Sequence, residues 1–119
     1  MDETQMIGDA SAAADAWLER LDAGDVDATW EGTSSLFRQL VDQPKWASSY
    51  EQVTAIFGRA LSRELGTTEY RTSIPGAPDG EYVVLEYMTE FERKKEAVET
   101  VVVALDLDGA WRVGGYFVR

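Results

Sequence analysis

The sequence predicts a single α+β domain, in which three N-terminal helices pack on one face of a curved four-stranded antiparallel sheet. Up to about residue 66 apolar residues recur at steps of three and four, which is typical of helices. Beyond it they recur at steps of two, which is typical of strands. Residues 1–8 show neither period and are expected to form a flexible tail, so that residues 9–119 make up the domain.

The helical half divides into three segments. The first helix is expected over residues 12–21, and the second over residues 26–41 with Gly32 as a weak point inside it. A third helix carries Trp46 and ends near residues 63–66, because its apolar residues continue at helical steps to that point. These helices would present one apolar stripe each to the sheet.

The strand half divides into four segments, expected over residues 69–74, 81–92, 98–107 and 111–118. The alternation is clearest in the second strand. Every other residue from Val83 to Phe91 is apolar except Thr89, and the residues between them include glutamates. The third strand is apolar on both faces near its middle, as a central strand would be.

Turn residues separate the strands. Residues 93–96 read as a charged hairpin tip, and Asp108-Gly109 is a strong hairpin signal. The acidic residues beside Gly109 lack the spacing of a calcium loop, so the hairpin explains them better. Gly114-Gly115 inside the last strand predicts a bulge, a bend or the close approach of another backbone.

Composition limits the function classes. The 119 residues include 22 Asp and Glu against 11 Lys and Arg, and the net charge of −11 repels phosphate backbones and anionic lipids. We therefore expect no nucleic-acid partner and no membrane insertion. Cysteine and histidine are absent, which removes thiolate chemistry, the commonest general base and the commonest transition-metal ligands, and leaves only carboxylate-type metal sites open. No metal and no cofactor is expected. The first residues lack the basic and apolar stretches of a signal peptide, so no export signal is expected in them.

The alternation of side chains along the third predicted strand places one carboxylate, that of Glu99, on an apolar face. Glu99 shares its face of the third strand with Val101, Val103, Leu105 and Leu107. It could be a general acid or base with a raised pKa, or the anchor of a cationic ligand. The alternative is that Glu99 lies at a frayed strand end or forms a structural ion pair with Arg63 or Arg71.

Aromatic residues supply further candidates. Tyr82, Tyr87 and Tyr116 could line a pocket and offer hydroxyls to a ligand, although tyrosines in strands more often serve in cross-strand packing. The spacing of the four tryptophans indicates core packing first and a ligand platform second. The candidate ligand-binding residues are therefore Glu99, Tyr87, Tyr116, Arg63 and Trp46, and no residue is assigned as catalytic.

Several of these segments together resemble a known family. Trp17-Leu18, Trp46, the loop from Pro75 to Tyr82 and the ending Trp111-Arg112-Val113-x-Gly115-Tyr116 are similar to DUF4019, a family of small bacterial proteins of unknown function. The resemblance covers nearly the whole chain. It implies a cone-shaped fold of the NTF2-like or cystatin-like kind and suggests a periplasmic or exported protein, and it brings no catalytic residues.

Two functions follow as hypotheses. The first is a non-catalytic domain that binds a small apolar or cationic ligand, or that pairs as a homodimer or with another protein. The second is an enzyme of the NTF2-like isomerase or dehydratase sort, with Glu99 as base and Tyr116 or Tyr87 as donor to an oxyanion. The enzyme requires Glu99 and a tyrosine hydroxyl to converge on one cavity.

Overall fold

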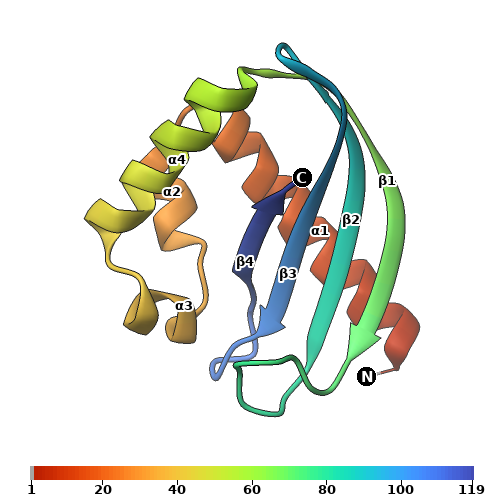
Figure 1. The fold of residues 1–119 in the computed structure, drawn as a ribbon. Coiled ribbons are helices and arrows are strands. Elements are labelled where there is room, and N and C mark those ends of the chain that lie inside the picture. The colour runs from red at the N-terminus through yellow and green to blue at the C-terminus, as the bar shows by residue number, and fades with distance from the viewer. Residues whose placement is uncertain (1) are drawn as a thin grey trace.

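An antiparallel sheet with the strand order β1-β2-β3-β4 forms one layer of the protein, and helices form the other (Figure 1). The computed structural model describes residues 2–119. Its elements are, in chain order, α1 (Glu3–Asp22), α2 (Val26–Glu31), α3 (Ser35–Leu40), α4 (Gln43–Phe57), β1 (Ala60–Arg71), β2 (Tyr82–Phe91), β3 (Lys94–Leu105) and β4 (Trp111–Val118). The α+β class predicted from the two periodicities is confirmed.

The first helix begins earlier than the sequence suggested. Asp2 caps α1, because its side chain accepts a hydrogen bond from the backbone N–H of Gln5 at 2.8 Å. Residues 3–8 are therefore helical, and the expectation of a tail is wrong for them; Met1 lies outside the described residues. The helix buries Met6 and then Ala10 and Ala14, so its apolar face extends through the segment that looked aperiodic.

The second predicted helix is two short helices. The chain leaves helical geometry between α2 and α3 because residues there pair with the edge of the sheet. The N–H of Ser34 donates to the carbonyl of Val113 at 2.8 Å, and the N–H of Val113 donates to the carbonyl of Gly32 at 3.0 Å. Gly32, the weak point noted in the sequence, ends α2, and the Ser34 side chain caps α3.

The boundary between the third predicted helix and the first strand was wrong by several residues. The last helix ends at Phe57, since Gly58 follows with φ +76°, a conformation that does not continue a helix. The strand then starts at Ala60, opposite Phe91, and runs to Arg71 instead of covering residues 69–74. The helical spacing of the apolar residues up to Leu61 misled the prediction, because pairing with β2 overrides it.

The remaining strands follow the predicted pattern with two corrections. The turn between β2 and β3 falls at residues 92–93, so residues 94–96 belong to β3 and not to a hairpin tip. β3 ends at Leu105, and Leu107 is 98% exposed in the next turn. Of the three alternatives for Gly114-Gly115, the structure shows the bulge, because the register shifts where Gly114 is skipped between the partners of Val102 and Val103.

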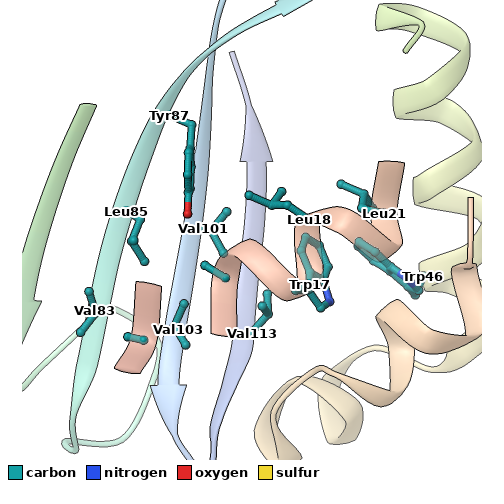
Figure 2. Close-up of a cluster of buried hydrophobic side chains, with 12 residues drawn as sticks. Trp17, Leu18, Leu21, Trp46, Val83, Leu85, Tyr87, Val101, Val103 and Val113 are labelled. Atoms are coloured by element: carbon teal, nitrogen blue, oxygen red, sulfur yellow. The ribbon is translucent and has the colours of Figure 1, made fainter. Parts of the chain in front are cut away.

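A single long helix, α1, covers the inner face of the sheet. Figure 1 shows α1 crossing behind all four strands, whereas α2, α3 and α4 gather beyond β4. The prediction of three helices packed on one face is corrected accordingly. The core lies between α1 and the sheet (Figure 2), and its buried members come from α1, α4 and the inner faces of β2, β3 and β4: Ala10, Ala14, Trp17, Leu18, Leu21, Trp46, Val83, Leu85, Tyr87, Val101, Val103 and Val113.

The packing of Trp17 against Gly32 gives a test of this fold. A Cβ added at Gly32 would lie 2.9 Å from the Cδ1 of the buried Trp17 ring, so Gly32→Ala is expected to lower the free energy of unfolding by about 1–3 kcal/mol. Gly8 in α1 has open space around it, and Gly8→Ala is expected to raise that free energy by about 0.5–1 kcal/mol. Urea denaturation of both variants measures the difference, and equal effects of the two substitutions would contradict the packing described.

Candidate functional site

The buried carboxylate of Glu99 lies at the centre of a polar cluster. Its side chain is 0% exposed. The Oε1 atom accepts hydrogen bonds from Arg63 Nε at 2.6 Å and from Thr89 Oγ1 at 2.6 Å. The Oε2 atom accepts from Arg63 Nη2 at 3.2 Å and from the hydroxyl of Tyr116. These donors stand on β1, β2 and β4, so the carboxylate on β3 joins all four strands.

Arg63 connects this cluster to the end of α1. Its Nη1 and Nη2 atoms donate to the two carboxylate oxygens of Asp22 at 2.7 and 3.0 Å. Burial by itself lowers the pKa of Arg63, but the hydrogen bonds to Asp22 and Glu99 outweigh it and hold the pKa of Arg63 above its ordinary range. The guanidinium is therefore a fixed cation whose hydrogen bonds point to two carboxylates.

Tyr116 closes the cluster on the β4 side. Burial raises the pKa of its hydroxyl, and the negative charge and hydrogen bond of Glu99 raise it further. The phenol is thus held neutral, with its proton donated to Glu99. Its ring packs against Trp17 with 5.3 Å between the ring centroids.

A cavity of about 330 Å³ opens beside the cluster, and we call it the Glu99 pocket. Glu99 and Tyr116 reach it from the sheet, and the last residues of α1 and one side of α4 form the opposite walls. The lining residues are Leu21, Asp22, Trp46, Ser49, Tyr50, Val53, Thr54, Gly58, Arg59, Ala60, Phe91, Glu99 and Tyr116.

Hydrogen bonds fix the aromatic wall of this pocket. The indole N–H of Trp46 donates to Thr29 Oγ1 at 3.0 Å, and the Tyr50 hydroxyl donates to the carbonyl of Leu21 at 3.1 Å. Trp46 also packs against Trp17 with ring centroids 5.8 Å apart. Figure 2 shows Trp46 beside Leu21 at the end of the core. The wall is therefore formed before any ligand arrives.

Three of the five candidate residues meet at the pocket. Glu99, Tyr116 and Trp46 line it, and Arg63 lies behind Glu99 as its ion-pair partner. Tyr87 is the cross-strand neighbour of Glu99 but does not line the pocket, and its hydroxyl donates to Asp15 at 3.0 Å (Figure 2). Burial, followed by that hydrogen bond, raises the pKa of Tyr87. Its buried ring belongs to the core, and its hydroxyl joins β2 to α1.

The sequence reasoning missed two members of the cluster, Asp22 and Thr89. Asp22 could have been noticed as a carboxylate in the last turn of a helix, where it opposes the helix dipole and needs a cationic partner. Thr89 was placed on the inner face by parity, and a hydroxyl among apolar residues on such a face needs an acceptor. Neither residue carried a motif that would have singled it out.

Other chemistry is accounted for within the described residues. No group of three or more acidic side chains there is arranged to hold a metal ion. Asp106 and Asp108 accept hydrogen bonds from Arg112, and hydrogen bonds to Arg112 and to the Ala110 N–H lower the pKa of Asp108 to about 2. Among residues 2–119, no helix combines the length and the apolar character that crossing a bilayer requires.

The fold and the site define a small α+β protein with an open antiparallel sheet and an enclosed polar cluster beside a pocket. A family model described as a protein of unknown function, DUF4019, matches residues 13–116. The chain belongs to this family, as its tryptophans and C-terminal run had indicated. No curated protein matches the sequence.

The raised pKa of Tyr116 predicts a pH dependence. In the unfolded chain a tyrosine loses its proton near pH 10, whereas the folded protein retains the proton on Tyr116. The folded state then binds more protons, so the free energy of unfolding falls as the pH rises above about 10. Tyr116→Phe removes this group, and denaturation between pH 9 and pH 11 should show a smaller fall for the variant.

Thr89→Val is the control for this experiment. It removes a hydrogen bond to Glu99 but no titrating group, so it is expected to lower stability at every pH and to keep the wild-type pH dependence. A Tyr116→Phe variant with the same pH dependence as the wild type would contradict the assignment.

Proposed function

We propose that this protein is a non-catalytic binding protein that holds a small apolar or cationic molecule in the Glu99 pocket. The observation that carries the proposal is a preformed cavity with apolar and aromatic walls, whose two carboxylates, Glu99 and Asp22, are held in place by Arg63. Small-molecule sites have this character: mostly apolar surface with a few placed polar groups. The volume of about 330 Å³ is at the lower end of the usual range for such sites, so the ligand is small.

The pairing of Glu99 argues for binding over catalysis. A carboxylate has about four lone-pair sites, and four protein donors approach those of Glu99. A general base must accept a proton from its substrate, so at least one of these donors would have to leave first.

The isomerase or dehydratase alternative rests on one observation. Glu99 and Tyr116 do line the same cavity, which that chemistry requires. The Tyr116 proton, however, is donated to Glu99 and not toward a position where an oxyanion could form. Ligand binding accounts for the same residues without rearranging them.

The family resemblance supports the same proposal from a different side. In an NTF2-like or cystatin-like cone a pocket lies between the helices and the curved sheet. Residues of α1, α4 and the sheet also line the Glu99 pocket, which supports the comparison. An exported or periplasmic protein of this kind would meet small molecules outside the cytoplasm. Both points come from the resemblance.

A homodimer or a protein partner on the outer face of the sheet has weaker support. The exposed apolar side chains Met88 and Phe117 stand on β2 and β4, with β3 between them, and Glu86 and Glu90 are their neighbours on that face. Scattered apolar side chains among charges are ordinary surface. The pocket is therefore the stronger candidate.

Filling the pocket tests the proposal. Val53 lines the cavity from α4, and Val53→Phe is expected to occupy part of it. With 1-hexanol as the probe, the indole N–H signal of Trp46 in a nitrogen-15 NMR spectrum should shift in the wild type. The variant should bind at least about tenfold more weakly, because the probe loses the apolar surface that it would cover.

Val84→Phe is the matched control, since Val84 lies on the outer face of β2. It should keep the wild-type affinity for 1-hexanol. The proposal fails if 1-hexanol leaves the Trp46 signal unchanged, or if Val53→Phe and Val84→Phe bind the probe equally well.

A further inference from the structure

We infer that the ligand of the Glu99 pocket is an organic cation, an ammonium group on a short apolar body, with its charge beside Asp22. The inference rests on the proposed binding function and adds the chemical class of the ligand. It follows from the electrostatics of the walls, the hydrogen-bonding groups that remain open, and the aromatic rings.

Two helices end at this pocket. Leu21 and Asp22, the last residues of α1, line it, and so do Thr54 in the final turn of α4 and Gly58, which caps that helix. Figure 1 shows both helix ends at the same end of the molecule. The C-terminal end of a helix carries a partial negative charge, so the two ends together favour a cation between them.

The carboxylate of Asp22 adds to this negative potential, although its position at the end of α1 is unfavourable for the stability of the helix. An acidic side chain in the last turn of a helix is repelled by the helix dipole. Each oxygen of Asp22 accepts one bond from Arg63, and the side chain is 42% exposed. Lone-pair sites on both oxygens therefore remain for a ligand that donates hydrogen bonds.

Arg63, by contrast, offers little to an anion. Its Nε, Nη1 and Nη2 atoms all donate to Asp22 or Glu99, and its side chain is only 16% exposed. An anionic ligand would meet the carboxylates of Asp22 and Glu99 without a free donor from this guanidinium. Because four donors already occupy the lone pairs of Glu99, the acceptors that stay open to a ligand are those of Asp22.

Aromatic rings complete the site. Trp46, Tyr50, Phe91 and Tyr116 all line the pocket. A cation is attracted to the face of such rings, and cages of aromatic residues recognise ammonium groups in this way. The net charge of −11 on the whole chain also draws cations toward the protein at long range.

Arg59 is the group that works against a cation. It lies just before β1 and lines the pocket beside Gly58 and Ala60, whereas Asp22 ends α1. An anion would be expected at Arg59, and a cation at Asp22. The sign of the preferred ligand charge therefore decides between these two side chains.

A series of three probes with one alkyl chain tests the sign: hexylammonium, 1-hexanol and hexanoate, each titrated into the protein by calorimetry at neutral pH and low salt. We expect hexylammonium to bind at least tenfold more tightly than 1-hexanol, and hexanoate to bind most weakly. Hexanoate binding as tightly as the cation, or more tightly, would overturn the inference and leave the binding function standing.

Asp22→Asn locates the charge. It should weaken binding of the cation five- to tenfold more than it weakens binding of 1-hexanol, because only the cation loses a charge that attracts it. Asp79→Asn, which makes the same charge change in an exposed loop, should leave both affinities as in the wild type. Equal effects of the two substitutions on the cation would also overturn the inference. If none of the three probes binds, the proposed binding function fails, and the inference fails with it.

Discussion

The buried charge of Glu99 is the constraint on which the rest of the structure depends. An ionised carboxylate with no exposure is very costly unless donors surround it, and the protein supplies these donors from β1, β2 and β4. Arg63 then requires a second acceptor, which Asp22 provides at the end of α1. One side chain thereby links the four strands to one another and, through Arg63, to the end of the helix that covers them.

The pocket is a consequence of the same arrangement. Because Arg63 holds the end of α1 against β1, and the turn at Gly58 directs α4 away from the sheet, the two helix ends and the sheet enclose a space that core side chains do not fill. A buried ion pair seldom adds net stability compared with apolar residues of the same size. The position of this cluster beside a cavity with aromatic walls therefore supports the proposed binding site.

The sequence predicted the parts of the fold that depend on local pattern. The alternation in β2 and β3 and the turn at Gly109 were read correctly, the bulge at Gly114 was one of three alternatives, and parity placed Glu99 on the inner face. The errors fall where distant segments decide the local conformation. Ser34 leaves helical geometry to pair with Val113, and residues 60–68 pair with β2 although their apolar spacing suits a helix. For the site, the ion pair of Glu99 with Arg63 was one of the alternatives, while Asp22 and Thr89 required the tertiary structure.

A double-mutant cycle on Arg63 and Glu99 tests the central claim most directly. Arg63→Met should lower the free energy of unfolding by about 3–5 kcal/mol, because it leaves the buried charge of Glu99 without its cationic partner. Glu99→Leu should lower it less, because Arg63 keeps its hydrogen bonds to Asp22. The double variant should be less destabilised than the sum of the two by at least about 1–3 kcal/mol. Additive effects would contradict the account, since they would mean that the two charges do not depend on each other.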